Sequence, residues 1–321
     1  MKKITCLVLA LLMIFALCAC GSSDGGVKTI GISQYGEHAS LDNCREGFLQ
    51  GLKDAGLVEG EDFEIAYQNA VFDNAIATQI GQSFSATNVA IMCAIATPSA
   101  TACYAAAEDK DIPVVFTAIT DPIEAGLVDG NITGTSDKLP VAAQLELIRA
   151  LQPEAKTIGI LYTTSEPNSV TAIAEYEAVA PEYGFEIVAI GVSAQSEVTQ
   201  AADTLIAKGV DCLSNLTDNN VVGVLSSILE KTDDAGIPVY GSEVEQVKLG
   251  CVAAAGIDYI LLGRQTGMMA AKIITGEASA YDMDYETISE YGIYVNSDAI
   301  ARLGVTVPEE IAEKAIESAA E

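Results

Sequence analysis

Lys28-Thr29-Ile30-Gly31-Ile32-Ser33 is the stretch that decides the fold, because the chain repeats its pattern 128 positions later as Lys156-Thr157-Ile158-Gly159-Ile160-Leu161. A second pair of similar stretches has nearly the same separation. Asp111-Ile112-Pro113-Val114-Val115-Phe116 returns 125 positions later as Gly236-Ile237-Pro238-Val239-Tyr240. Short apolar runs of this kind are typical of buried strands in a parallel sheet. Two copies of one strand order at a period near 125 predict two similar lobes.

Segments with helical periodicity separate these strands. In the first copy we expect strands over 27–33, 63–67, 89–96 and 114–116, and helices over 41–55, 73–85 and 99–109. A polar connection at 131–139 leads to a helix over 141–151. The second copy predicts strands over 157–162, 186–190, 212–216 and 239–240, and helices over 169–183, 197–208 and 221–235. The remainder predicts strands over 250–255 and 292–295, a helix over 259–274 and a helical tail. This alternation is typical of an α/β protein with doubly wound parallel sheets and right-handed crossovers.

Neither predicted lobe closes on one continuous segment. We expect lobe 1 to comprise 27–137 with about 250–284, and lobe 2 to comprise 138–249 with about 285–321. The chain then crosses between the lobes more than once, and such crossings form a hinge.

The N-terminus has the pattern of an export signal. Lys2 and Lys3 precede an apolar run over 7–17 that is too short to span a bilayer comfortably. Leu17-Cys18-Ala19-Cys20 resembles a bacterial lipobox, which predicts a lipoprotein signal peptide over 1–19 and lipidation of Cys20. An ordinary cleaved signal is the alternative. Residues 20–26, rich in Gly and Ser, then form a flexible tether.

Composition excludes some classes of function. The formal net charge of −29 disfavours nucleic acid, whose binding needs a basic surface, and indicates a solvated acidic surface. The cysteines from Cys20 onward form no CxxC pair, so buried free thiols are the default, although spacing does not exclude a disulfide. A single histidine cannot build a His-rich zinc site, and we expect no metal and no cofactor.

From about Ile30 to Gly276 the sequence resembles a known family. The segments that carry the resemblance are His38-Ala39-Ser40-Leu41-Asp42 with Gly47-Phe48 and Gly51-Leu52, Ala96-Thr97-Pro98-Ser99-Ala100, Ile112-Pro113-Val114-Val115-Phe116 with Thr120-Asp121-Pro122, Asn131-Ile132-Thr133-Gly134-Thr135-Ser136-Asp137, Thr217-Asp218-Asn219, and 250–263. Their order and spacing are similar to those of bacterial ABC-transporter substrate-binding lipoproteins, specifically the subfamily that binds aromatic amino acids such as tryptophan. The resemblance implies a type I periplasmic-binding-protein fold, with two Rossmann-like lobes and three crossovers that close on a ligand.

Polar turns follow several of the predicted strands, at the carboxyl edge where open α/β sheets bind ligands. Thr97-Pro98-Ser99 precedes a helix, whose exposed amides and positive dipole end suit a carboxylate. An α-ammonium needs an acid from the other lobe, for which Asp218 is the first candidate and Glu243 the second. The full set of candidate ligand-binding residues is Tyr35, His38, Thr97, Ser99, Thr117, Thr120, Asp121, Ser165, Asn168, Ser169, Thr217, Asp218, Asn219, Ser242 and Glu243.

Each of these assignments has a structural alternative. Thr97, Ser99 and Asp218 are also typical helix caps, and Asp121 before Pro122 is a common turn. His38 is placed near the cleft by its position in the family motif, and a surface hydrogen bond is the alternative. Aromatic residues near strand ends, Tyr35, Phe72 and Tyr162, either flank an aromatic ligand or belong to the core.

The predicted function is capture of a small solute for an ABC permease, by a chain we expect to be monomeric. Catalysis is disfavoured because the chain has no GxGxxG, GxxxxGK[ST] or GxSxG motif. The absence of tryptophan weakens a sugar site, which usually needs aromatic platforms. A branched-chain amino acid or a nucleoside would use the same fold, and a ligand sensor for a signalling partner remains open.

Overall fold

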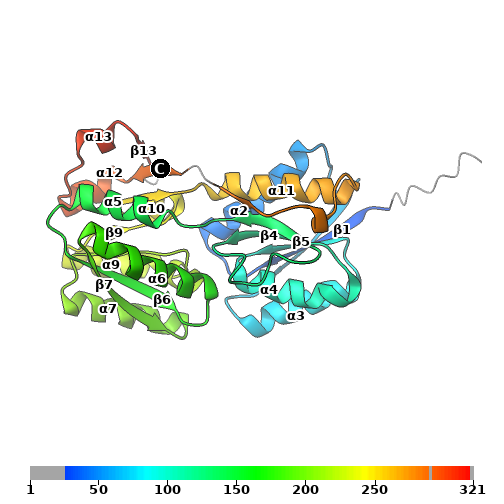
Figure 1. Ribbon diagram of the computed structural model, residues 1–321, viewed down its shortest axis with the longest axis horizontal. Helices are drawn as coiled ribbons and strands as arrows, with labels where there is room; N and C mark the ends of the chain where they lie inside the picture. The colour runs from blue at the N-terminus through cyan, green and yellow to red at the C-terminus, as the bar shows by residue number, and fades with distance from the viewer. Residues whose placement is uncertain (1–25, 289–290, 319–321) are drawn as a thin grey trace, which may run out of the picture.

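The computed structural model describes residues 26–288 and 291–318, which form two α/β lobes side by side along the longest axis of the molecule (Figure 1). The signal peptide over 1–19, Cys20 and the tether up to residue 25 lie outside the described residues. Among the described residues, no helix combines the length and the apolar character that crossing a membrane requires.

The first copy of the repeated stretch lies in β1 (Lys28–Gln34), the strand next to one edge of the first lobe's sheet. Its strand order is β11-β5-β4-β3-β1-β2, and every pairing is parallel. The strands are β1 Lys28–Gln34, β2 Phe63–Asn69, β3 Ile91–Ile95, β4 Val114–Ile119, β5 Ile132–Ser136 and β11 Glu286–Thr287. Strands β1, β3 and β4 are apolar and almost entirely buried, as central parallel strands must be.

Helices cover both faces of this sheet. Helices α2 (Ala39–Asp54) and α11 (Tyr259–Thr275) lie on one face, and α3 (Asn74–Thr87) and α4 (Thr97–Ala107) lie on the other (Figure 1). Asp73 caps α3 by accepting hydrogen bonds from the amides of Ala75 and Ile76, as predicted.

Four glycines, Gly47 and Gly51 on α2 and Gly263 and Gly267 on α11, allow the two helices to pack very closely. A Cβ at Gly51 would lie 2.1 Å from the carbonyl oxygen of Arg264, and one at Gly267 would lie 2.1 Å from that of Phe48. No side chain fits at such distances, so small residues on both helices hold the two backbones together.

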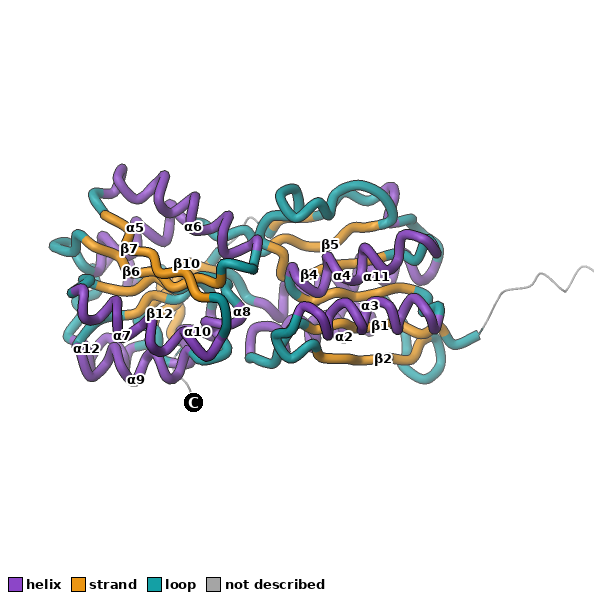
Figure 2. Tube along the Cα trace, turned by 90° about the horizontal axis from the view of Figure 1, so that it is seen from below, coloured by secondary structure: helices purple, strands orange, loops and turns teal. Residues whose placement is uncertain are grey.

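The second lobe has a parallel sheet of order β7-β6-β8-β9 and a smaller mixed sheet of order β10-β12-β13. The strands are β6 Thr157–Thr163, β7 Glu186–Val192, β8 Cys212–Ser214, β9 Val239–Tyr240, β10 Ala253–Gly256, β12 Gly292–Val295 and β13 Ala315–Glu317. Its α-helices are α5 Val141–Leu151, α6 Pro167–Val179, α7 Val198–Lys208, α8 Asn219–Val222, α9 Leu225–Ala235, α10 Val244–Leu249, α12 Ser297–Leu303 and α13 Glu309–Ala312 (Figure 2).

The chain passes between the lobes at three places: after β5, between β10 and α11, and between β11 and β12. The structure corrects the expected position of two boundaries. We placed about 285–321 in lobe 2, but β11 pairs with β5 in the sheet of the first lobe. We placed about 250–284 in lobe 1, but β10 pairs antiparallel with β12 and its alanines pack into the core of the second lobe. The expected polar connection at 131–139 also contains a strand, β5, and the expected helical tail ends in β13.

The cysteines of the described chain are free thiols. Cys44, Cys93, Cys103, Cys212 and Cys251 are all buried, and none forms a disulfide. They therefore act as small apolar core residues, which is the default that their spacing predicted.

Candidate ligand-binding site

The carboxyl ends of the strands in both lobes meet at a narrow cavity. Both lobes and the segments that join them line it, with His38, Ser40, Leu41, Ala118, Asp137, Thr217, Asn219, Val222, Glu243, Gln246 and Tyr259. The cavity measures about 10 Å³, room for roughly one water molecule. The lobes are therefore closed on one another, and a larger molecule enters only when they separate and the lining side chains move.

Two buried carboxylates are among the residues that line this cavity. Asp137 follows β5 at the first crossover and accepts hydrogen bonds from the hydroxyls of Tyr259 and Thr120. Glu243 caps α10 in the second lobe, accepting from the amides of Glu245 and Gln246. Burial raises the pKa of Asp137 above its usual value and raises the pKa of Glu243 to about 7.

Neither carboxylate has a cationic partner among the described residues, whose ion pairs all involve other acids. A buried charge is costly unless it is paired. The cavity therefore presents two acidic side chains with which a bound cation can pair.

A chain of hydrogen bonds fixes His38 at the cavity wall. The side-chain nitrogen of Asn219 donates to Glu166, which turns the Asn219 oxygen toward Nε2 of His38 at 3.5 Å. His38 then donates from Nε2, and its buried Nδ1 is left as an acceptor without a partner. Burial lowers the pKa of His38 to about 4, so the imidazole is neutral at physiological pH.

The N-terminus of α4 is a second unsatisfied group near the cavity. Thr97, the first residue of α4, is buried, and its hydroxyl has no hydrogen-bond partner. The preceding residue, Ala96, has φ of 78° and provides no side-chain cap. Its amide bonds to the carbonyl of Thr117, the neighbour of the cavity residue Ala118. An uncapped helix N-terminus with a free hydroxyl is suited to bind an anion.

Backbone strain is concentrated at the same edge of the first lobe. Val71, Phe72, Ala96 and Ala118 all have φ between 53° and 78°, although none is glycine. All four follow or end strands of the first sheet on the side that faces the second lobe. Strained backbone of this kind is typical of functional sites.

Phe72 forms an aromatic cluster beside the cavity. Its ring stacks on His38 with centroids 6.4 Å apart and planes within 6°, and it meets Tyr35 edge-on at 6.0 Å. The Tyr35 hydroxyl donates to the carbonyl of Phe72 and so helps to hold the strained turn. A Cβ at Gly223 of the second lobe would lie 3.2 Å from this ring, so Phe72 reaches across the gap between the lobes.

Three side-chain contacts join the lobes directly. Ser40 donates to Glu243 at 2.9 Å, the hydroxyls of Thr120 and Thr217 lie 3.2 Å apart, and His38 contacts Asn219. Because the lining residues come from both lobes, these contacts exist only in the closed arrangement.

The structure places some predicted site residues at the cavity and others elsewhere. His38, Thr217, Asn219 and Glu243 line it, and Thr120 contacts the lining residues Asp137 and Thr217. Tyr35 contacts Phe72, and Thr97 begins α4. Asn168 donates to the carbonyl of Thr217 and to Glu166. Ser242 is tied to Gln246 through its amide and hydroxyl, and Ser165 lies in a separate surface groove.

Asp218 needs a correction, because its carboxylate is fully used within its own lobe. It accepts from the amide and hydroxyl of Thr163, from the hydroxyl of Ser169 and from the amide of Val221. The residue is 0% exposed and does not line the cavity. Asp218 therefore joins β6, α6 and α8 as a structural cap, and Ser169 serves the same network.

Three further predicted residues have structural partners. The hydroxyl of Ser99 accepts from Ser33, and that of Thr117 accepts from Thr135 within the first lobe. Asp121 accepts from the amides of Ile123 and Glu124 and so closes a turn. Asp121 thus forms the turn that was its alternative to ligand binding, whereas Ser99 and Thr117 bond to side chains of β1 and β5.

Sequence reasoning missed several cavity residues. Asp137 lay in a segment that we treated as a polar connection, and its motif was the one signal that marked it. Tyr259 and Gln246 lie on helices where nothing in the local sequence distinguishes them from core or surface residues. Ser40 lies two residues after His38 in the same motif, so it could have been predicted by the reasoning that placed His38 near the cleft.

Comparison with known proteins gives consistent matches over most of the chain. Residues 29–319 match the family described as ABC transporter substrate binding protein. The chain is 38% identical over 322 residues to a tyrosine-binding protein from Clostridioides difficile strain R20291, covering 94% of this chain and 92% of that protein.

Two solved structures are informative about the arrangement of the lobes. An ABC domain in complex with L-Trp from Streptococcus pneumonia is 31% identical, with a TM-score of 0.87 over 91% of this chain and 99% of that one. The ligand-free, open structure of a substrate-binding protein with adhesive properties from Clostridium difficile is 37% identical, with a TM-score of 0.68 over 92% of this chain and 100% of that one. The open structure has the higher sequence identity but the lower TM-score, which indicates that its lobes are similar to those of this chain but are arranged differently. The present structure thus resembles the ligand-bound arrangement, in agreement with its interlobe hydrogen bonds.

Proposed function

The chain belongs to the family of ABC transporter substrate-binding proteins, and we propose that it captures an aromatic amino acid between its lobes for delivery to a membrane permease. The observation that carries the proposal is the pair of buried carboxylates, Asp137 and Glu243, at a cavity between the lobes without a cationic partner among the described residues. An amino acid brings the missing cation. The similarity to a tyrosine-binding protein and to a structure in complex with L-Trp supports an aromatic side chain.

The α-ammonium group of the ligand is assigned to Asp137 and Glu243. An ammonium donates three hydrogen bonds, and each carboxylate retains acceptor capacity beyond the bonds it already accepts. Hydrogen bonds to charged groups contribute about 1.5–3 kcal/mol each. Because Asp137 follows β5 at the first crossover and Glu243 precedes α10 of the second lobe, an ammonium bound to both would link these two parts of the chain.

The α-carboxylate is assigned to the N-terminus of α4. The unpaired Thr97 hydroxyl and the uncapped amides of the first turn supply donors there. The Ser99 hydroxyl is not part of this assignment, because it is engaged with Ser33 inside the first lobe.

The aromatic ring of the ligand is assigned to the side of the cavity that His38 lines, where Phe72 stacks on His38. Ring stacking contributes about 0.5–1.5 kcal/mol beyond area burial. The unpaired Nδ1 of His38 can accept a hydrogen bond from a phenol or an indole N–H. Tyr35 acts indirectly, because its hydroxyl is bound to the backbone of Phe72.

The N-terminal pattern and the family support a location outside the cytoplasm. Substrate-binding proteins of ABC transporters act outside the cytoplasm. We further propose that Cys20 carries a lipid anchor, that residues 21–26 act as a tether, and that the chain works as a monomer without a cofactor and without catalysis.

A melting-temperature panel tests the ligand. The chain from Gly21 onward is mixed with each of the twenty amino acids, with nucleosides and with common sugars, because a ligand that binds only the folded state raises the melting temperature. A rise with tyrosine, tryptophan or phenylalanine alone supports the proposal. A rise with nucleosides or sugars and none with aromatic amino acids overturns the ligand and keeps the fold.

A further inference from the structure

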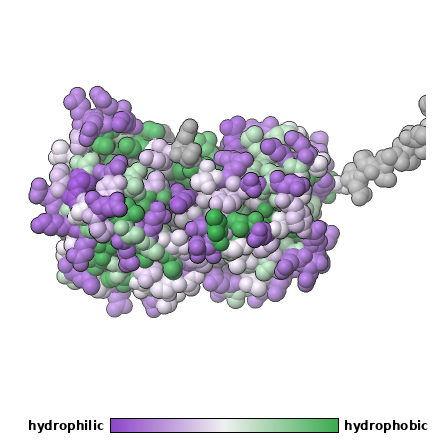
Figure 3. All heavy atoms as spheres, in the orientation of Figure 1, coloured by the Kyte–Doolittle hydropathy of each residue, from purple (hydrophilic) through white to green (hydrophobic). Residues whose placement is uncertain are grey.

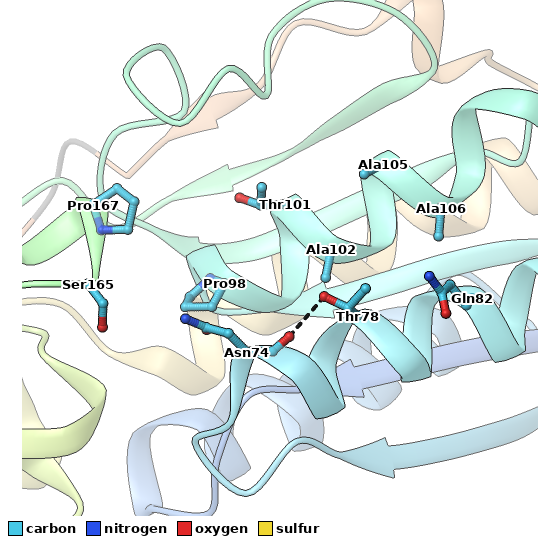
Figure 4. A pocket seen from close by; sticks show the side chains of 10 residues that line it. All are labelled: Asn74, Thr78, Gln82, Pro98, Thr101, Ala102, Ala105, Ala106, Ser165 and Pro167. Carbon is cyan, nitrogen blue, oxygen red and sulfur yellow. Dashed lines mark hydrogen bonds between the residues drawn. The ribbon is translucent and has the colours of Figure 1, made fainter. Parts of the chain in front are cut away.

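Glu166 is a buried acid at the junction of the two lobes. Its chain neighbours Ser165 and Pro167 share a surface groove with Asn74 and Pro98 of the first lobe (Figure 4). Hydrophilic side chains predominate at the periphery of both lobes, where water can solvate them (Figure 3). Glu166 is instead 1% exposed. A carboxyl group in such a place needs hydrogen bonds from the protein itself.

Asparagines supply these hydrogen bonds. Oε2 of Glu166 accepts from the side-chain nitrogen of Asn219 at 2.6 Å, from the main-chain amide of Asn219 at 3.2 Å and from the side-chain nitrogen of Asn168 at 3.3 Å. Oε1 accepts from the side-chain nitrogen of Asn220 at 3.0 Å. Burial and the nearby charge of Asp218 raise the pKa of Glu166 to about 8. A proton on this carboxyl would sit on Oε1, because Asn220 can turn its amide round, whereas the main-chain N–H at Oε2 cannot turn. Asn219 is therefore held in the same way in both protonation states.

This arrangement fixes the orientation of Asn219 and, through it, the tautomer of His38. Since the Asn219 nitrogen is held at Glu166, its oxygen faces Nε2 of His38 at 3.5 Å. The neutral imidazole then carries its proton on Nε2, and Nδ1 is an acceptor. His38 is the N-cap of α2, yet its side chain makes no capping bond, and Nδ1 is buried without a partner among the described residues. Nδ1 is thus free for a donor that enters with a ligand.

Asn168 provides a second unpaired acceptor in the same network. Its side-chain nitrogen donates to Glu166 and to the carbonyl of Thr217, which lines the cavity. Its buried side-chain oxygen has no partner among the residues that the structure describes. Buried acceptors without a donor are costly, and each one calls for an explanation. Two of them in one network indicate that the ligand brings a donor to this side of the cavity.

We propose that Glu166 determines which aromatic amino acids the site selects: by holding Asn219, it keeps Nδ1 of His38 as an acceptor, so that rings with an O–H or N–H donor bind in preference to phenylalanine. The inference rests on the proposed function. Glu166 is a positioning residue, because it acts through Asn219 and does not line the cavity. Tyrosine and tryptophan carry such a donor. A site built to bond a donor rejects the analogue that lacks it, since its own acceptor is then left unpaired.

The tautomer can be measured directly, because His38 is the single histidine of the chain. The protein is made with ¹⁵N-labelled histidine and without a histidine tag, and two-bond ¹⁵N–¹H NMR correlations show which ring nitrogen carries the proton. We expect Nε2–H in the wild type and in Glu166→Gln, which keeps an acceptor oxygen for Asn219. Glu166→Met removes that oxygen and should give a mixture of tautomers. Asn219→Ala should do the same and keeps Glu166, so it serves if Glu166→Met does not fold. An Nδ1–H tautomer in the wild type overturns the inference.

Pairs of ligands that differ in the ring donor measure the selection. L-Tyrosine is compared with 4-fluoro-L-phenylalanine, and L-tryptophan with 3-benzothienyl-L-alanine, by calorimetry. For the amino acid that the wild type binds, we expect the member with the donor to bind at least about tenfold more tightly. His38→Phe keeps a ring beside Phe72 but removes the acceptor, and should bring the two members within about twofold. Equal affinities in the wild type overturn the inference and leave the proposed function standing. If the wild type binds no aromatic amino acid, the proposed function itself fails.

A ring acceptor tests the part played by Glu166. The nitrogen of 3-(4-pyridyl)-L-alanine meets the lone pair of Nδ1 in the wild type, whereas a His38 freed to change tautomer can donate to it. We expect the affinity for this analogue relative to phenylalanine to rise at least about fivefold in Glu166→Met and Asn219→Ala, and to stay at the wild-type value in Glu166→Gln. Asn220→Ala is the matched control, because its side chain bonds to Glu166 at the other oxygen, and it should also keep the wild-type ratio. An unchanged ratio in Glu166→Met and Asn219→Ala, or an equal rise in Asn220→Ala, overturns the role of Glu166.

Discussion

Replacing Glu243 by glutamine separates the charge of this side chain from its shape. In the proposed site the Glu243 carboxylate faces the ligand ammonium, and an amide retains an acceptor oxygen but not the charge. Loss of a hydrogen bond between charged groups costs about 1.5–3 kcal/mol, which corresponds to about tenfold to hundredfold weaker binding at pH 8. Glu245→Gln is the matched control, because the Glu245 carboxylate pairs with Lys248 and does not line the cavity.

The pH dependence of binding gives this prediction its sharpest form. Burial raises the pKa of Glu243 to about 7 in the structure without ligand, so the group is mainly protonated below neutral pH. An ammonium favours the ionised form, so binding at lower pH must first remove the proton. Affinity of the wild type should then fall about tenfold from pH 8 to pH 6 and about a hundredfold to pH 5. His38, whose pKa is lowered to about 4, stays neutral over this range.

Isothermal titration calorimetry between pH 5 and pH 8 measures both effects. We expect Glu243→Gln to show a much flatter profile than the wild type, so that the two proteins converge at low pH. With 3-indolepropionate, which lacks the amine, the difference between wild type and variant should disappear. If Glu243→Gln binds tryptophan or tyrosine as the wild type does, with the same pH profile, the assignment of the ammonium is wrong.

Three further predictions concern stability and binding. Asp137→Asn should weaken binding of the same amino acid by about 1.5–3 kcal/mol in calorimetry, and equal affinities would remove Asp137 from the ammonium site. Gly267→Ala should lower the free energy of unfolding by about 1–3 kcal/mol in a denaturant titration, because its Cβ would lie 2.1 Å from the Phe48 carbonyl oxygen. Ser83→Ala, on the exposed side of α3, is the control and should be nearly neutral. Equal denaturation midpoints for the two variants would contradict the close helix contact. Without ligand, the raised pKa of Glu243 means that the folded protein holds a proton that the unfolded chain releases. The free energy of unfolding should therefore fall as the pH rises from about 4.5 to about 7, by at most about 1.4 kcal/mol per pH unit for this group. A steeper fall in Glu243→Gln than in wild type would contradict the assignment.

The regular elements were predictable because each depends on local pattern. Helix α5 and strands β9 and β12 lie where the periodicity placed them, and Asp73 caps α3 as its type and position indicated. Strand β5 was missed because its sequence, Ile132–Ser136, is small and polar, although it is fully buried. Its Thr135 hydroxyl is satisfied by Thr266 of α11, which is more than a hundred residues away. No local signal reports a partner at that distance.

For the site, too, local sequence patterns identify candidate residues, whereas their contacts depend on residues far away in the chain. Glu243 and His38 were found from turns and motifs, but whether an acid is free for a ligand depends on donors from elsewhere in the fold. Asp218 illustrates the limit, because Thr163 and Ser169 consume its oxygens from two other elements of the same lobe. The sequence places all three residues near strand ends and cannot show that their side chains turn toward one another.

The two buried acids also explain why closure would depend on the ligand. Closing the lobes brings Asp137 and Glu243 to one narrow cavity, where burial penalises both charges. An ammonium between them offsets this cost in the closed arrangement only, and a ligand shifts an equilibrium only by its differential affinity for the two states. A shift from 1% to 99% closed needs about 5.5 kcal/mol, which two charge-assisted contacts at about 1.5–3 kcal/mol each can largely supply. An analogue without the amine should therefore occupy the cavity weakly and leave the lobes mainly open. The charge of the ligand, rather than its ring, would then set the fraction of closed receptor.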